Sequence, residues 1–268
     1  MTKRNRQTFI GLLLLGTMVT VALLGPVLYR ISPFEQDLRR SLEGPSPDHP
    51  LGTDELGRDL LSRIIHGLGI TLLISFSGVF LGGAAGSLLG LTAGYFGGWW
   101  DHFATGCTEV LMAIPGFLLA LVIAITLKSS PLNLSLAVAI FTLPGFARIL
   151  RAKALELREQ EYVIAAGALG ARRRQILRWH LLPNSLPLLY TLFVQRLSSA
   201  LLTASGLSFL GLGPQPPLPE LGSMLNTGRE YLWVAPHLCI LPGIAITLCI
   251  IGFNLLGNGL QRTKANGN

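Results

Sequence analysis

The chain has 268 residues, of which half are hydrophobic and only 13% are charged. A soluble domain carries about a quarter charged residues, so this composition argues against one. Several segments of roughly 20 residues are almost free of charge, the length that crosses a hydrocarbon core of about 30 Å. None shows the alternation of a membrane β-strand, so we expect an all-α polytopic membrane protein forming a single domain over 1–268.

Six transmembrane helices are predicted in chain order. They are Thr8–Tyr29, Ile70–Tyr95, Phe103–Leu127, Leu132–Leu150, Ser185–Gly206 and Ala235–Leu256. The first follows basic residues but is too long for a signal peptide, so we expect it to be retained. The segments 33–69 and 208–234 are expected on the outer side and the charged loop 151–184 on the inner side. Prolines interrupt 208–219, and a short helix is expected after them, within 220–232.

The distribution of basic residues predicts that both termini lie in the cytoplasm. With the N-terminus inside, the inner side holds most of the lysines and arginines, including Arg172, Arg173 and Arg174, and few acidic residues. This is the pattern of the positive-inside rule. It accounts for the net charge of +7 without a nucleic-acid partner.

Glycine recurs every four residues along the second predicted span. The row consists of Gly78, Gly82, Gly86, Gly90 and Gly94. Residues four apart share one side of a helix, and small residues there let another backbone approach closely. The row could slide against a partner protein, but we predict that it packs within the helix bundle.

Glu109 lies well inside the third predicted span and Arg196 well inside the fifth. A charge in the middle of a bilayer costs roughly 2.5–3.5 kcal/mol, so such residues face the bundle interior or a water-filled path. They could form an ion pair, line a translocation path, or have a structural role at the membrane interface.

The inner loop 151–184 has the pattern of a helix–turn–helix. Ala165 and Ala166 would present a small, flat helical surface that fits a groove of another protein, and Gly170 permits a turn at the helix end. The segment Arg172–Trp179 is predicted to form a second short helix, ended at Leu182 by Pro183. Such a rigid element suits mechanical coupling to another protein, although an ordinary amphipathic loop is the alternative.

No catalytic or metal-binding pattern is found in the sequence. It has no GxxxxGK(S/T) phosphate loop, no HExxH and no GxSxG, so we expect neither an enzyme nor a bound cofactor. Cys107, Cys239 and Cys249 lie in apolar segments and are expected to be small packing residues.

The loop and four further blocks resemble the permease family of peptide and nickel ABC importers, in its C-type branch. In the loop, Ala165-Ala166, Gly170 and His180–Pro183 follow the spacing of that family's EAA loop. The other blocks are His49–Gly67, Gly97-Gly98 with Asp101, Glu109 and Ile114-Pro115, then Ser208–Gly222 and Phe253–Leu260.

The resemblance implies a type I ABC importer permease of six transmembrane helices in the bacterial inner membrane. Its cargo would be short peptides or nickel and metal-chelate complexes. Two ATPase subunits would bind and hydrolyse ATP, an external binding protein would deliver the substrate, and a second homologous permease would complete a heterodimer in the lipid. The residues expected to matter are Glu161, Ala165, Ala166, Gly170 and Pro183 for coupling, Gly57, Arg58 and Asp59 at the outer vestibule, and Glu109 and Arg196 near the path.

The chain departs from the family pattern at several positions. Ile164 occupies the slot of the acidic residue that names the loop, Ala204 stands where many peptide carriers have glutamate, and Leu221 and Asn258 replace a usual tryptophan and aspartate. These changes are a slight indication of a nickel or metal-chelate subgroup. Two other functions remain as alternatives, a secondary transporter driven by an ion gradient and a membrane-bound regulator that does not transport.

Overall fold

A computed structural model describes the backbone of residues 3–265 and the side chains of residues 7–261. Its described part consists of helices and loops, and its β pairing is limited to one isolated bridge between Thr53 and Asp59. This confirms the all-α prediction. The helices are α1 Lys3–Leu28, α2 Leu60–Phe96, α3 Gly98–Ala113, α4 Gly116–Thr126, α5 Pro131–Arg158, α6 Glu161–Ala168, α7 Arg173–Ile176, α8 Leu182–Phe209, α9 Leu221–Gly228 and α10 His237–Ala265.

A helix lies at each of the six predicted spans, but the spans differ in character. By length and composition, four helices of the described chain could cross a membrane, namely α1, α2, α5 and α10. The predicted third span is broken into α3 and α4, which are bent by 91° and count together as a fifth. The reason is Pro115, which lacks an N–H and forces Ile114 into an extended conformation. The 28-residue α8 has the length but carries Gln195 and Arg196, so six spans remain a prediction.

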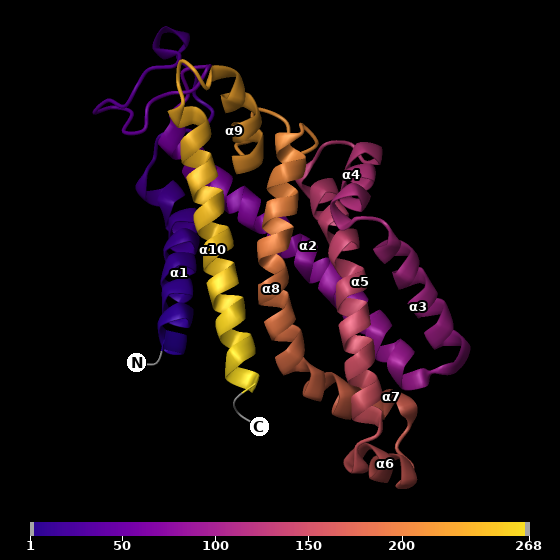
Figure 1. Ribbon diagram of the computed structural model, residues 1–268. Helices are drawn as coiled ribbons and strands as arrows, with labels where there is room; N and C mark the ends of the chain where they lie inside the picture. Colours follow the sequence, from indigo (N-terminus) through magenta and orange to yellow (C-terminus); the bar gives the residue numbers. More distant parts are fainter. Residues whose placement is uncertain (1–2, 266–268) are drawn as a thin grey trace.

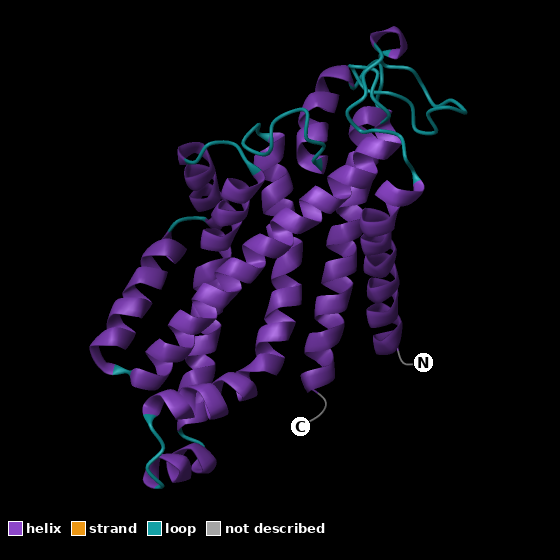
Figure 2. Ribbon diagram, turned by 180° about the vertical axis from the view of Figure 1, so that it is seen from behind, coloured by secondary structure: helices purple, strands orange, loops and turns teal. Residues whose placement is uncertain are grey.

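The two ends of the molecule are built differently. Both termini and the α6–α7 hairpin lie at one end in Figure 1, and the 29–59 segment and α9 lie at the other. We call these the inner and outer ends, after the predicted orientation. Seen from behind, α2 crosses the bundle obliquely from the outer to the inner end (Figure 2).

The glycine row of α2 lies directly against the backbone of α5. A β-carbon at Gly82 would be 2.3 Å from the carbonyl oxygen of Ala139, and one at Gly90 would be 2.2 Å from that of Ala147. Over the whole row, the α5 carbonyls that the five glycines meet are also four residues apart, those of Ser135, Ala139, Leu143, Ala147 and Arg151. This confirms that the row packs within the bundle.

Two helices extend beyond the predicted spans. α2 begins at Leu60 instead of Ile70 because Asp59 caps it, accepting a hydrogen bond from the Ser62 backbone N–H at 2.6 Å. α5 continues to Arg158, so the first residues of the 151–184 loop are helical. Hydropathy marks the part of a helix that crosses lipid, whereas caps decide where the helix begins and ends. The short helix expected within 220–232 is confirmed as α9.

Candidate functional site

The α6–α7 hairpin at the inner end is closed by a tight glycine turn. Gly170 has a φ of +87°, which favours glycine because other residues are strained there. The N–H of Gly170 donates to the Gly167 carbonyl and that of Ala171 to the Ala166 carbonyl, both at 3.0 Å. The predicted role of Gly170 as the turn residue at the end of α6 is therefore confirmed by its geometry.

The hairpin is anchored on one side and exposed on the other. Val163, Ile176 and Leu181 are buried and belong to the main hydrophobic core. Glu161 and Ala165 are exposed, and Ala166 is half-buried. The hairpin also exposes two large apolar side chains that were not predicted to matter, Ile164 (59%) and Leu169 (89%), and Trp179 (65%) is exposed just after α7. Exposed large apolar side chains are a feature of protein-binding surfaces.

The structure corrects the prediction that Pro183 ends the second helix. A π-helical turn, Leu177–Leu181, joins α7 to α8, and Pro183 lies in the first turn of α8. In a regular helix the proline ring would clash with the carbonyl four residues back. The wider turn, in which the Leu182 N–H donates to the Leu177 carbonyl, avoids this conflict.

At the outer end, the three expected vestibule residues are largely internal. Gly57 has a φ of +72°, and a β-carbon there would be 1.8 Å from the carbonyl oxygen of Asp37, so only glycine fits. Arg58 is 3% exposed, and its Nε donates to Asp54 at 2.6 Å while its Nη2 donates to Glu55 at 2.7 Å. Arg63 binds the same Asp54 carboxylate at 3.1 Å.

Asp59 joins three parts of the outer end. Besides capping α2, its carboxylate accepts hydrogen bonds from Tyr29 Oη at 3.1 Å and contacts His49 Nδ1 at 2.8 Å. Burial, together with this carboxylate, raises the pKa of Tyr29 to about 12, so the phenol stays a donor at neutral pH. These residues therefore hold the outer segment in shape. Among the expected vestibule residues Gly57, Arg58 and Asp59, Arg58 also lines a cleft of about 160 Å³ beside the 208–227 segment.

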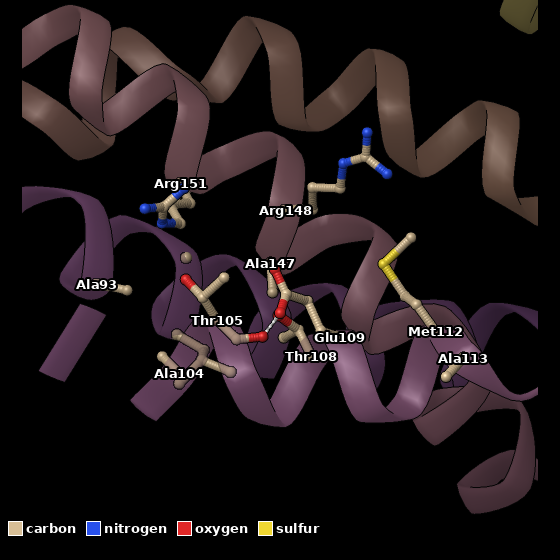
Figure 3. Close-up of a pocket in the computed structure, with 12 residues that line it drawn as sticks. Ala93, Ala104, Thr105, Thr108, Glu109, Met112, Ala113, Ala147, Arg148 and Arg151 are labelled. Carbon is tan, nitrogen blue, oxygen red and sulfur yellow. Dashed lines mark hydrogen bonds between the residues drawn. The ribbon is translucent and has the colours of Figure 1, made fainter. Parts of the chain in front are cut away.

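Glu109 lines a cleft of about 380 Å³ between α2, α3 and α5. Figure 3 shows it with Arg148 and Arg151, which come from α5. Arg151 is neutralised by Asp101, with two hydrogen bonds of 2.5 and 2.6 Å. Arg148 lies near the end of the predicted fourth span and counts among the basic residues of the inner side, so its place in this cleft was not predicted.

Arg196 lies at the contact of α8 with α5 and does not line the cleft of Glu109. A β-carbon at Gly145 of α5 would be 2.6 Å from Nη2 of Arg196. No ion pair joins Glu109 to Arg196 within the described residues, so the suggested pairing is wrong. The same part of the chain holds no group of three or more His, Cys, Asp or Glu side chains that could bind a metal ion.

Comparison with known proteins identifies the family of this chain. The family model described as "Binding-protein-dependent transport system inner membrane component" matches residues 86–263. The chain belongs to this family. The permease is similar to the dipeptide transport system permease protein DppC of Alkalihalophilus pseudofirmus, with 38% identity over 97% of this chain and 85% of that protein. It is also similar to the glutathione transport system permease protein GsiD of Pectobacterium atrosepticum, with 44% identity over 84% of this chain and 75% of that protein.

Solved structures support the same fold for the permease. A chain of the MetNI methionine ABC transporter, in an inward-facing conformation, matches with a TM-score of 0.58 at 19% identity. The match covers 75% of this chain and 95% of the other. The type I permease fold and the function of an ABC importer permease in the inner membrane are thereby confirmed. Permeases of this family work with ATPase subunits and substrate-binding proteins.

Proposed function

We propose that this permease imports short peptides across the bacterial inner membrane, together with a second homologous permease, two ATPase subunits and an external binding protein. The observation that supports peptide cargo is the similarity to permeases named for dipeptide and glutathione transport, over 97% and 84% of the chain. Nickel or metal-chelate cargo, which the departures at Ala204 and Leu221 slightly favour, is the second candidate. In this proposal both termini lie in the cytoplasm.

The α6–α7 hairpin is the proposed contact with the ATPases. Glu161, Ala165 and Ala166 lie on α6, and Gly170 forms the turn beyond it. The exposed apolar side chains at Ile164, Leu169 and Trp179 would be buried by a partner protein, and Pro183 would fix the start of α8 above the hairpin. ATP-driven movement of the ATPases would then shift the hairpin, so that the path opens alternately to the two sides of the membrane.

The deciding experiment is purification of the complex from its native membrane in mild detergent, followed by reconstitution in proteoliposomes. We expect a second permease and two ATPases to co-purify. Uptake of a dipeptide delivered by the binding protein should require ATP and persist with a protonophore, and nickel with and without a chelator serves as the competing cargo. A homo-oligomer without ATPase, whose uptake stops with the protonophore, would instead establish the ion-driven alternative.

The turn of the hairpin gives a sharper test of coupling. Gly170→Pro should lower ATP-driven uptake at least about tenfold, because proline fixes φ near −65° and removes the N–H that closes the turn. Gly167→Ala is the matched control, since its new β-carbon would lie 3.9 Å from Ile176, in ordinary contact. Uptake and membrane abundance are measured for both variants. Normal uptake by the Gly170→Pro complex would show that the hairpin does not couple.

A further inference from the structure

Two arginines near the contact of α5 with α8 lack an acidic partner. Arg196 is near the middle of the 28-residue α8, half-buried, with its guanidinium over Gly145 of α5. Arg148 follows Gly145 by three residues, which places it on the same side of α5 about one turn nearer the inner end. Within the described residues, neither guanidinium forms an ion pair or a side-chain hydrogen bond.

The surrounding charges leave this region positive. Asp101 is already paired with Arg151, and Figure 3 shows Arg148 and Arg151 leaving α5 in different directions. Glu109 on α3 is the remaining carboxylate that lines the same cleft as Arg148. Glu109 is thus the carboxylate available beside Arg148, and within the described residues no carboxylate is paired with Arg196.

The position of Arg196 excludes an ordinary lipid-facing role. A guanidinium at the centre of a membrane helix is costly and faces water or protein instead of acyl chains. Among the long helices described, α8 is the one that is not apolar enough to be counted as a membrane span. Because Arg196 is only half-buried, its free donors remain accessible from the surface of the subunit.

We infer that Arg148 and Arg196 form an anion-binding station on the translocation path, which holds the carboxylate of the cargo during passage. Guanidinium groups bind carboxylates through paired, charge-assisted hydrogen bonds, and a passing carboxylate would supply the missing counter-charge. The inference rests on the proposed import of peptides and names their C-terminal carboxylate as the recognised group.

The test uses the complete importer in proteoliposomes, with alanyl-alanine and alanyl-alanine amide as cargo. The affinity of the binding protein for both is measured first, and each is supplied at saturation. Relative to wild type, Arg196→Gln and Arg148→Gln should each lower uptake of alanyl-alanine about tenfold, and they should change uptake of the amide by less than about twofold. Arg196→Lys, which keeps the charge, should retain most of the uptake of the free acid.

Each other outcome has a definite reading. Wild-type rates in both Gln variants would overturn the station while leaving peptide import intact. An equal loss of uptake for both cargoes, in complexes that assemble normally, would show that the arginines have a structural role or pair with the partner permease. That result would also overturn the anion-binding station. Absence of peptide uptake by the wild-type importer would refute the proposed function itself, and this inference with it.

Discussion

Glu220 shows how much a single residue can determine at the outer end. Its side chain is completely buried, and its two carboxyl oxygens accept hydrogen bonds from Thr71 Oγ1 at 3.0 Å and from the Ser223 N–H at 2.8 Å. It thereby caps α9 and ties that helix to α2. No ion pair neutralises it among the described residues, and burial raises the pKa of its carboxyl above 4.5.

This shift predicts a pH dependence of stability. A carboxyl whose pKa is higher in the folded state binds its proton more tightly there, so its contribution is fully present below about pH 4.5 and is lost as pH rises through the folded-state pKa. Glu220→Gln removes this titration. We expect the thermal stability of the variant, relative to wild type, to improve from pH 4.5 toward neutrality. Parallel pH profiles of the melting temperature in detergent would contradict the assignment.

Sequence could identify some residues of the site but not their surroundings. Gly170 was predicted as a turn residue, because glycine at a helix end has a local conformational meaning. Arg58, by contrast, is buried against Asp54 and Glu55, and the neighbouring Arg63 joins them only through the tertiary fold. Arg148 lies inside the predicted fourth span, but the sequence does not show which cleft its side chain lines.

At the scale of elements, the α2–α5 contact is the helix packing that the glycine pattern predicted. The spacing of the glycines predicted packing, and the structure adds the partner helix. The π-helical turn before α8 was not predictable, since a proline signals a helix boundary but does not show whether a wider turn will absorb it. Pro115 is a residue type that can kink a span, but the sequence does not show that the third span bends by 91° there.

The α2–α5 contact predicts that two glycine-to-alanine substitutions differ in their effect on thermal stability. Gly86→Ala places a β-carbon 2.3 Å from the Leu143 carbonyl oxygen, a backbone atom that cannot move aside cheaply. Overpacking of this kind costs about 1–3 kcal/mol. Gly16→Ala in α1 is the control, because a β-carbon there meets nothing within 4 Å. Thermal unfolding in detergent should show a lower melting temperature for Gly86→Ala alone; equal values would contradict the contact.

At the scale of the whole molecule, the charged residues and the termini define an orientation. Because the hairpin and both termini share one end (Figure 1), a single labelling experiment tests the whole topology. With Cys107, Cys239 and Cys249 replaced by alanine, Gly44→Cys at the outer end should react with an impermeant maleimide in intact spheroplasts. Arg174→Cys on the hairpin should react only in inverted vesicles. The reverse pattern would invert the proposed orientation.

The glycine-mediated contact also has a mechanical consequence. α2 and α5 are about 56 and 42 Å long at 1.5 Å per residue, and Arg158 at the inner end of α5 donates to the Gly94 carbonyl of α2 at 3.3 Å. Two rods in backbone contact resist bending, so they act as one lever that begins beside the hairpin and ends at Asp59. A tilt of about 5° in a rod about 56 Å long moves its far end by about 5 Å. Under the proposed coupling, a modest push at the hairpin would move the outer end of this pair, at Asp59, by several ångströms.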